Sequence, residues 1–553
     1  MAVFSVDLGA LDTNFNPPAG LSNSVYTLLQ QANGRVLAGG SFLDVGGSAT
    51  RDYIFRLNAD GSLDETFNPP TEIRGDILSL VQQTDGRVLA GGGFLFIGTN
   101  GSRDRLIRLN ADGGLDTNFN PPGGLNNGVN SITPLPDGRI LVGGAFTNVA
   151  GDDIRDYLIR LNSDGSLDES FDTETVLNDW VRTVVTGTDG KILVGGRFSD
   201  AGGDIYRDRL VRLNLDGSLD TSFNPPASLN NDVITLAMQS DGRILVGGTF
   251  TDVGGETDRD RLIRLNTDGS LDTTFIPFSN LNSSIYSLIP LSDGRVLVGG
   301  SFVNANGEAI RDRIICINAD GSLDESFNPP SNLNNTVWAV VPQSDGQLLV
   351  GGLFTDVGGE VDRDRLIRLD YERGTSKLSV PDLTQVRWLR GGASPEAYRV
   401  EFEVSTDGGI SFSFLGEGKR INGGWDLHGL RLPATATIRA RAHVPSGISN
   451  GSVAHYEESL SINMTGTPSI RLKGKSRLTT TRSSITLRGT ANDPDNDLLS
   501  VRYRSGKRTR LAKGTSAWSA KVSLNPGLNR ILVQAYDSRG VVSRPVTVII
   551  RRG

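Results

Sequence analysis

The 553-residue chain is poor in cysteine and histidine, and this scarcity narrows the chemistry open to it. Cys316 is the only cysteine, which excludes an intrachain disulfide and a cysteine-rich metal site. The three histidines, His428, His443 and His455, all follow the repeats described below. The repeats therefore contain no imidazole for a catalytic triad or for a histidine-bound zinc ion.

Long apolar runs are also missing. None approaches the ~18 residues needed to span a bilayer, so the sequence predicts no transmembrane segment. The first residues, MAVFSVDLGALD, have no basic segment followed by an apolar core, so no signal peptide is visible. Export stays open if the numbering omits a leader.

A repeat of 52 residues fills the first two thirds of the chain. A glycine pair marks its frame and begins at Gly39, Gly91, Gly143, Gly195, Gly247, Gly299 and Gly351. Leu-Asp, Phe and Arg-Asp recur at fixed places around that pair, from Leu11, Phe15 and Arg51 onward. Periods of about 40 to 50 residues with strand-like units are typical of β-propeller blades. The 68 glycines and 23 prolines agree with an all-β protein that has many tight turns.

Each unit predicts four short strands, and the sixth unit shows the pattern. Residues 285–288 open the first strand, and the turn at Asp293-Gly294 leads into a second strand over 295–298. Asp-Gly between apolar runs favours such a hairpin. A third strand follows over 313–317, and a turn at Asp320-Gly321 returns the chain through a fourth over 323–327.

The repeated small and apolar positions predict how the blades pack. Small residues two places into the first strand indicate that this strand is innermost, where a ring of blades is most crowded. They are Thr27, Ser79, Ser131, Thr183, Thr235, Ser287 and Ala339. The glycine pair predicts a close backbone approach or a bulge. Leu297 and Phe302 are expected to pack between neighbouring blades, and Cys316, in the slot of Arg56, is expected to be a plain strand residue.

The segments FNPP, DGRVLVGG and RLNADGSLD together resemble the delta-60 repeat of bacterial surface and secreted proteins. The resemblance covers roughly residues 1–370. It implies a seven-bladed β-propeller and an extracellular or cell-surface location, and it carries no catalytic residues.

The chain enters this repeat out of phase, which bears on how the ring closes. Residues 11–15 form an outer strand without an inner hairpin of their own, so we expect them to complete the seventh blade beside residues 364–369. Closure of this kind removes exposed sheet edges. The alternative is that residues 377–380 supply that strand.

Two smaller β-sandwich domains are predicted after the propeller. Residues 398–404 and 438–444 alternate apolar and mostly polar positions, as half-buried strands do. With VRWLRGG, STDGG and Gly424-Trp425 they resemble a fibronectin type III-like module. From Thr467 onward, ITLRGTANDPDND and LNRILVQAYD resemble a bacterial immunoglobulin-like or cadherin-like domain. The predicted domains are 1–372, 373–465 and 466–553.

Charge is divided unevenly between these domains. Residues 466–553 hold 18 Lys and Arg against four Asp, a net charge of +14. The remaining 37 basic and 59 acidic residues give residues 1–465 a net charge of −22. A basic hairpin in the last domain could bind an acidic polysaccharide or an anionic envelope; the alternatives are a solvated face and docking on the acidic propeller. Its residues are Arg502, Arg504, Lys507, Arg508, Arg510 and Lys513. Nucleic acid is disfavoured, since no base-reading motif is present.

Two acidic patterns invite a calcium hypothesis. Asp493, Asp495 and Asp497 resemble the calcium-binding loops of cadherin-like domains, and an exposed turn is the alternative. The repeated Asn-Ala-Asp-Gly-Ser-Leu-Asp segment is better explained as a turn, because its glycine placement does not fit an EF-hand loop. Calcium is therefore the one cofactor that the sequence suggests.

Strand order predicts which face of the propeller binds. Both Asp-Gly turns of a unit lie at one end, so both long connections emerge at the other, and long loops on a rigid scaffold often carry function. The fourth unit breaks the pattern there, and aromatic residues occupy the variable inner-strand position in other blades. The candidate ligand-binding residues are Trp180, Arg182, Asp172, Glu174, Asp179, Tyr26, Tyr286 and Trp338. The alternative is that these rings pack between blades.

The seven Arg-Asp pairs, from Arg51-Asp52 to Arg363-Asp364, recur too regularly for one ligand. We expect them to be structural, as ion pairs or loop clamps. We therefore expect a non-enzymatic bacterial surface or secreted protein that binds a glycan or a protein. The alternative is a carbohydrate-active hydrolase or lyase that uses two carboxylates.

Overall fold

The computed structural model describes residues 8–47, 51–96, 103–151, 155–173, 177–187, 189–203, 207–255, 259–278, 281–307, 311–359, 363–464, 466–494, 497–538 and 540–553. In this part of the chain every regular element is a strand, apart from seven short 3-10 turns. These turns are η1 (Val45–Gly47), η2 (Val149–Gly151), η3 (Ala201–Gly203), η4 (Val253–Gly255), η5 (Ala305–Gly307), η6 (Val357–Gly359) and η7 (Ile448–Asn450). Over the same ranges, no helix is long and apolar enough to cross a membrane.

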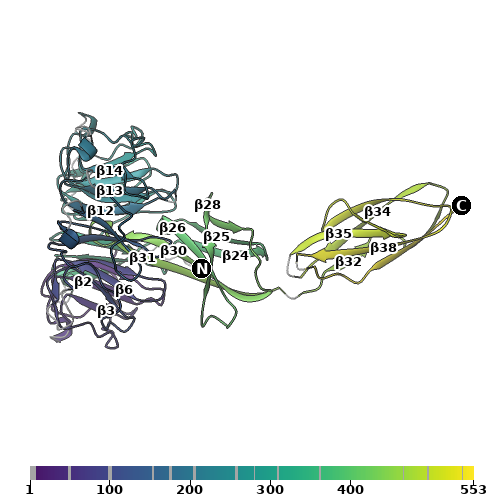
Figure 1. Ribbon diagram of the computed structural model, residues 1–553, viewed down its shortest axis with the longest axis horizontal. Helices are drawn as coiled ribbons and strands as arrows, with labels where there is room; N and C mark the ends of the chain where they lie inside the picture. The colour runs from purple at the N-terminus through teal and green to yellow at the C-terminus, as the bar shows by residue number, and fades with distance from the viewer. Residues whose placement is uncertain are drawn as a thin grey trace. The chain divides into compact units, whose positions relative to one another are not determined.

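Seven antiparallel units, each with an inner, a middle and a third strand, follow one another along the repeats. Strands of several of these units are labelled in Figure 1. The inner strands are β1 (Val25–Gln30), β5 (Ile77–Gln82), β9 (Val129–Pro134), β12 (Val181–Thr186), β15 (Val233–Met238), β18 (Ile285–Pro290) and β21 (Val337–Pro342). The middle strands are β2 (Val36–Gly40), β6 (Val88–Gly92), β10 (Ile140–Gly144), β13 (Ile192–Gly196), β16 (Ile244–Gly248), β19 (Val296–Gly300) and β22 (Gln347–Gly352). The third strands are β3 (Ile54–Leu57), β8 (Leu106–Leu109), β11 (Leu158–Leu161), β14 (Leu210–Leu213), β17 (Leu262–Leu265), β20 (Ile314–Ile317) and β23 (Leu366–Asp370). A short extra pair joins β4 (Ile73–Arg74) to β7 (Leu95–Phe96).

The units close into a ring around their inner strands. Each inner strand contacts the inner strands of the units before and after it, and β21 contacts β1. The predicted seven-bladed, all-β propeller with its first strands innermost is therefore confirmed. The predicted fourth strand is shorter than expected, because it pairs through a single bridge such as Ile317 with Leu323.

The glycine pair is explained by two different close approaches. A Cβ atom on Gly39 would lie 2.6 Å from Cγ2 of Ile77 in the next blade. A Cβ atom on Gly40 would lie 2.0 Å from the carbonyl oxygen of Ser24, beside a register shift between Val25 and Thr27. Both predicted reasons, close approach and a bulge, hold at this position.

Apolar cores fill the spaces between successive blades. Leu297 of the sixth blade, for example, joins a buried cluster with Val340 and Phe354 of the seventh, and Phe302 is equally buried. The predicted packing role of Leu297 and Phe302 is confirmed.

A buried or half-buried arginine also joins six of the seven blades to the next. Arg108 donates from Nε to Asp116 at 2.7 Å and from a terminal nitrogen to the carbonyl of Ser163 in the following blade at 2.6 Å. Its guanidinium lies 4.6 Å from the ring centroid of Phe119. Cys316 replaces this arginine in the sixth blade, and there the hydroxyl of Tyr371 lies 3.4 Å from the buried sulfur. Burial raises the pKa of the Cys316 thiol to about 12, in keeping with a plain strand residue.

In the Arg-Asp pairs, the arginine and the aspartate each bond to the backbone of a nearby loop rather than to one another. Arg363 donates to the carbonyl oxygens of Asp12, Thr13 and Phe15, and Arg103 donates in the same way to Thr117. The carboxylate of the following aspartate accepts a backbone N–H, as Asp364 does from Asp356 at 2.9 Å. The prediction of a structural loop clamp is confirmed.

The N-terminal segment completes the seventh blade, as predicted. Leu11 bridges Leu369, and the backbone N–H of Asp12 donates to Arg368. The side chains of Asp12 and Arg368 form an ion pair at 2.6 Å. Residues 377–380, the alternative, instead belong to β24 (Thr375–Asp382) of the next module.

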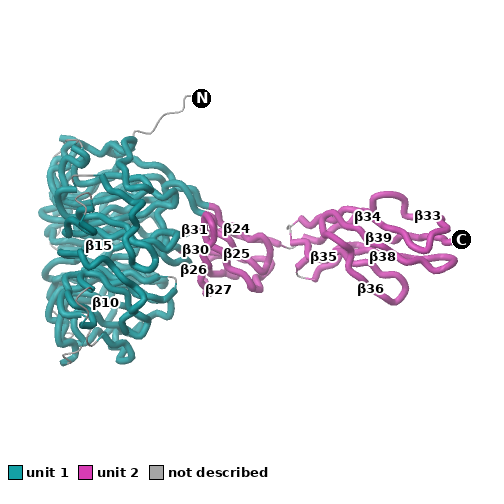
Figure 2. The backbone as a smooth tube through the Cα atoms, turned by 90° about the horizontal axis from the view of Figure 1, so that it is seen from above, with its two compact units in different colours: residues 1–376, 390–400, 442–457 teal, residues 377–389, 401–441, 458–553 magenta. Residues whose placement is uncertain are grey.

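The chain divides into two compact units (Figure 2). The first joins residues 1–376 to two later segments, 390–400 and 442–457; the second holds residues 377–389, 401–441 and 458–553. Two stretches of the predicted middle domain thus group with the propeller. The boundaries 1–372, 373–465 and 466–553 stay predictions.

The middle module contributes the strand orders β24-β25-β29-β28 and β27-β26-β30-β31. The second of these sheets continues into β5-β6-β8 of the second blade, because Val453 of β31 pairs with Val81 of β5. Besides β24 the module's strands are β25 (Gln385–Gly391), β26 (Arg399–Ser405), β27 (Ser413–Glu417), β28 (Lys419–Ile421), β29 (Gly424–His428), β30 (Thr435–Ser446) and β31 (Ser452–Asn463). The alternation predicted over 398–404 and 438–444 falls on β26 and β30.

The C-terminal domain is a sandwich of a three-stranded and a five-stranded sheet with the orders β32-β34-β37 and β33-β39-β38-β35-β36. Its strands are β32 (Ser469–Leu472), β33 (Arg477–Thr480), β34 (Ser484–Asn492), β35 (Leu498–Ser505), β36 (Arg508–Leu511), β37 (Ala517–Ser523), β38 (Gly527–Asp537) and β39 (Val546–Arg552). One buried cluster, which includes Trp518 and Val533, takes residues from both sheets. The all-β prediction therefore holds for this domain as well.

Candidate functional site

The tip of the β30–β31 hairpin enters the centre of the propeller, and we call residues 445–453 the plug. Its η7 turn contacts the inner strands β9, β12, β15, β18 and β21. Asn450 donates from Nδ2 to the carbonyl oxygens of Leu236 and Leu288, at 3.1 and 2.7 Å. Five blades thus meet a single turn at the axis.

Small polar residues of the inner strands hold the plug. The hydroxyls of Thr27 and Ser452 lie 2.7 Å apart, and Ser452 Oγ also accepts the backbone N–H of Leu80 at 2.9 Å. Ser79 donates its hydroxyl to the carbonyl of Gly451. In the first two blades, the small residue at position three of the inner strand therefore contacts a segment from outside the repeats.

Gly451 is fixed by space rather than by backbone conformation. A Cβ atom there would lie 2.4 Å from the carbonyl oxygen of Asn130 and 3.2 Å from Cα of Ser131. Any larger residue must push the plug away from the third blade.

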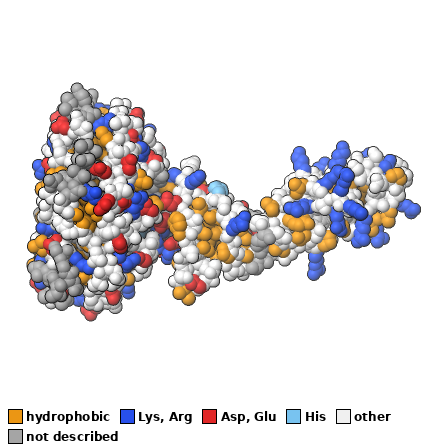
Figure 3. Space-filling model, in the orientation of Figure 1, with side chains coloured by type: hydrophobic (Ala, Val, Ile, Leu, Met, Phe, Trp, Pro, Cys, Tyr) orange, Lys and Arg blue, Asp and Glu red, His pale blue; other side chains and the backbone are white. Residues whose placement is uncertain are grey.

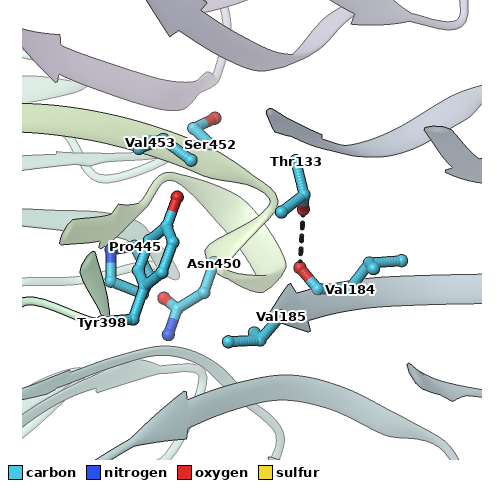
Figure 4. A pocket seen from close by; sticks show the side chains of 8 residues that line it. All are labelled: Thr133, Val184, Val185, Tyr398, Pro445, Asn450, Ser452 and Val453. Atoms are coloured by element: carbon cyan, nitrogen blue, oxygen red, sulfur yellow. Dashed lines mark hydrogen bonds between the residues drawn. The ribbon is translucent and has the colours of Figure 1, made fainter. Parts of the chain in front are cut away.

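A small cavity remains beside the plug (Figure 4). Its lining residues are Thr133, Val184, Val185, Tyr398, Pro445, Asn450, Ser452 and Val453. The Thr133 hydroxyl donates a hydrogen bond to the carbonyl oxygen of Val184 at 2.8 Å, as the dashed line shows. The walls are otherwise mainly apolar, so we interpret this space as a packing gap around the plug.

The plug enters the axis from the end where the inner strands finish. Beside it, Glu396 donates its N–H to the carbonyl of Pro290, and Tyr456 donates its hydroxyl to the carbonyl of Pro342. Both prolines end inner strands, at the end where the hairpin turns lie. The long connections lie at the opposite end, where the inner strands begin, and this agrees with the predicted strand order.

A ring of side chains surrounds the axis at that loop end, and we call it the axial mouth. Its members stand second in each inner strand: Tyr26, Leu78, Asn130, Arg182, Ile234, Tyr286 and Trp338. Trp338 lies 4.3 Å from Tyr286 and 5.6 Å from Tyr26, between ring centroids. All three rings are half-buried, so they pack on one another while part of each stays exposed.

Arg182 belongs to a second cluster, in the fourth blade. The guanidiniums of Arg182 and Arg197 lie 5.0 and 5.1 Å from the ring centroid of Trp180. Arg182 is paired with Asp232 at 3.5 Å, and Arg197 lies 3.8 Å from both Asp232 and Asp179. Trp180, Arg182 and Asp179 are therefore brought together, as the sequence suggested.

Sequence reasoning missed Arg197 and Asp232. Arg197 directly follows a glycine pair, where the other units carry Ser41, Gly93, Ala145, Thr249, Ser301 and Leu353. A charged residue found in one unit only was the available signal. Asp232 has no such signal in the sequence, because this residue precedes its inner strand in an ordinary polar segment.

The other two candidates, from the segment that precedes the fourth inner strand, are not part of this cluster. Asp172 is exposed, and its backbone N–H donates to the carbonyl of Asp216, in the turn after β14 of the fourth blade. Glu174 lies outside the described residues.

The basic hairpin of the last domain is exposed as predicted. Arg502, Arg504, Lys507, Arg508, Arg510 and Lys513 are all solvent-accessible. Space-filling representation shows Lys and Arg over this domain with little acidic surface among them (Figure 3).

Three buried aspartates meet at one end of the same domain. Oxygens of Asp493, Asp497 and Asp537 lie within 4.8 Å of one another. Carboxylate oxygens at this separation suit calcium, which prefers hard oxygen ligands. Asp537 was missed because it lies 40 residues along the chain from Asp497, and Asp495 lies outside the described residues. The Ser538 hydroxyl donates to Asp497 at 2.9 Å.

Together the fold and these surfaces define a repeat protein of the β-propeller class that also carries β-sandwich modules. The family model described as a domain of unknown function (DUF5122) beta-propeller matches seven segments, 31–67, 83–119, 135–171, 187–223, 239–275, 291–327 and 343–370. The seven repeats match this β-propeller family model, and the predicted propeller repeat is confirmed. No curated protein matches the chain.

Solved structures similar to parts of the chain include fibronectin type III modules. The fibronectin(III)-like modules of Clostridium thermocellum CbhA are 16% identical over 32% of this chain and 94% of theirs, with a TM-score of 0.17. A two-domain fibronectin type III segment of chicken tenascin is 14% identical over 32% and 97%, with a TM-score of 0.16. The SrpA adhesin of Streptococcus sanguinis is 10% identical over 16% and 58%, with a TM-score of 0.13. At these TM-scores the likenesses carry no argument about the fold or the function of this chain.

Proposed function

We propose that this chain is a non-enzymatic protein, active outside the cell or at a bacterial surface, that binds a glycan or a protein ligand at the axial mouth. The observation behind the proposal is that the plug fills the axis from the end where the inner strands finish and the hairpin turns lie. A ligand of the axis then has only the loop end to approach, where aromatic and charged side chains gather.

The mouth has two chemically different sides. Tyr286, Trp338 and Tyr26 belong to consecutive blades and form one arc, whereas Arg182 stands in the fourth blade, across the ring. Aromatic faces stack on the apolar faces of sugars and peptides. A guanidinium pairs with carboxylates through two parallel hydrogen bonds. A ligand with a ring and an acidic group would meet both sides.

The enzyme alternative needs two carboxylates free to exchange protons with a substrate. In the part of the chain that the structure describes, three carboxylates lie beside the mouth. Asp179 and Asp232 are ion-paired with arginine. Asp76 directly precedes its inner strand, as Asp232 does, and burial raises its pKa. Because the other two are held in ion pairs, the described residues of the mouth offer Asp76 no second free carboxylate for an acid pair, and this favours binding over hydrolysis.

A glycan array scored for both binding and released product tests the proposal with the intact chain. We expect retained ligands and no product. In the variants Arg182→Met and Tyr286→Leu the signal should fall at least tenfold, while Arg243→Met, in the β15–β16 turn at the plugged end, should bind as the wild type does. Equal binding by all variants of unchanged melting temperature would exclude the mouth as the site.

A further inference from the structure

One face of the C-terminal five-stranded sheet collects arginines from four strands. Val501 and Tyr503 point into the core, so Arg502 and Arg504 on β35 point outward. The strand register places Arg504 of β35 opposite Leu532 of β38. On the neighbouring strands, Ile549 of β39 lies between Arg530 of β38 and Arg477 of β33. The outward-facing arginines, which we call the arginine face, are Arg477, Arg502, Arg504, Arg530 and Arg551.

This face differs from the hairpin that the sequence singled out. Arg508 and Arg510 pair with Ser505 and Tyr503, and so stand on the other side of the sheet from Arg502. The arginine face instead includes Arg477, Arg530 and Arg551, which lie up to 74 residues apart in the chain and are placed on the same face by the strand register.

No acidic residue that the structure describes neutralises the arginine face within its own domain. Residues 466–553 contain only four acidic residues, and the three that the structure describes, Asp493, Asp497 and Asp537, are buried together. Within the described ranges, none of the five arginines forms an ion pair. Like charges this close repel one another unless a counter-charge binds.

Apolar groups lie between the arginines. The Arg502 guanidinium stands 4.5 Å from the ring centroid of Tyr536, and Leu532 and Ile549 are half-buried between the basic rows. Charge alternating with flat apolar surface is suited to a sugar polymer that carries acidic groups, because sugar rings have apolar faces.

We infer that the arginine face binds a linear acidic polysaccharide. Neighbouring strands lie ~4.8 Å apart, and residues that share a face of one strand lie ~7 Å apart, so the guanidiniums form an extended array rather than a pocket. Such an array matches charges repeated along a chain, and each guanidinium fits a carboxylate or sulfate in a two-pronged geometry. Nucleic acid would need a row of stacking rings, and Tyr536 is the one ring aligned with these arginines on the described face.

Two triple variants of the intact chain test the assignment. Arg477→Gln, Arg530→Gln and Arg551→Gln remove three charges from the arginine face. The control, Arg471→Gln, Arg488→Gln and Lys521→Gln, removes three exposed charges from the outer face of the opposite sheet. The probes are heparin, alginate, single-stranded DNA and vesicles with anionic headgroups.

We expect the first triple variant to lose roughly tenfold or more of its affinity for heparin and alginate, the control to lose much less, and added salt to weaken wild-type binding. Equal losses in both variants would overturn the proposal, because net charge alone would then explain the binding. Preference for vesicles or DNA over both polysaccharides would also overturn it. Matching thermal unfolding of the two triples establishes that both are folded.

Discussion

The propeller and the C-terminal sandwich both contain many arginines but place them in opposite environments. In the propeller, Arg108 and its counterparts are buried against an aspartate, a phenylalanine ring and the next blade's backbone. In the sandwich, Arg502 and its neighbours stand on an exposed face and have no acidic partner among the described residues of that domain. The propeller arginines, which recur with an aspartate partner, have a structural role. The sandwich arginines, which cluster without such a partner, are the ones we propose to bind a ligand.

The strongest way to test the scaffold half of this comparison is to remove one partner of a buried pair. Asp116→Ala leaves Arg108 buried without its carboxylate, and breaking such a pair costs about 3–5 kcal/mol. We expect a large fall in the denaturant midpoint. Asp112→Ala, in the exposed turn nearby, loses only a local bond to the Gly114 N–H and serves as control. Similar midpoints for both variants would contradict a structural role for the pair.

The plug offers a second, smaller test of the propeller. Gly451→Val inserts atoms beside Asn130, and overpacking of this kind costs roughly 1–3 kcal/mol. We expect a lower melting temperature and weaker protection of β9 amides from hydrogen exchange. Gly123→Val, where a Cβ atom meets nothing within 4 Å, is the matched control. An unchanged β9 in the Gly451 variant would mean that the plug is not held at the axis.

The calcium hypothesis concerns the sandwich. If Asp493, Asp497 and Asp537 bind the ion, calcium at about 100 times its Kd should stabilise this domain by about 2.7 kcal/mol. The melting temperature should rise with calcium in the wild type and stay constant in Asp537→Asn. A rise of equal size in that variant, or none in the wild type, would reject the site.

How much the sequence could predict depends on repetition. The blades, their inner strands and the closure by Leu11 could be predicted from one pattern that occurs seven times. Each position of the repeat could therefore be compared among seven copies. The plug was not predictable in this way, because it uses backbone carbonyls and small side chains of a loop that occurs once. Arg197 and Asp537 were missed for a related reason: each joins its cluster only through strand pairing or loop contacts.

The smallest expected effect is on acid stability, and it tests whether the propeller's pairs are ionised. Burial opposes charge on Asp64, but hydrogen bonds from Thr66 and Arg56 outweigh it and lower the pKa from 3.8 to about 2. The same balance lowers the pKa of Asp116 and Asp272. A carboxyl with a pKa lower in the folded than in the unfolded protein stabilises the fold above pH 3.8, and this contribution is lost as the pH falls towards 2. Asp64→Asn cannot ionise, so the stability gap between it and the wild type should be widest at neutral pH and should shrink between pH 4 and 2. Unfolding midpoints measured across that range give the gap directly, and a gap independent of pH would mean that Asp64 contributes through packing rather than through its charge.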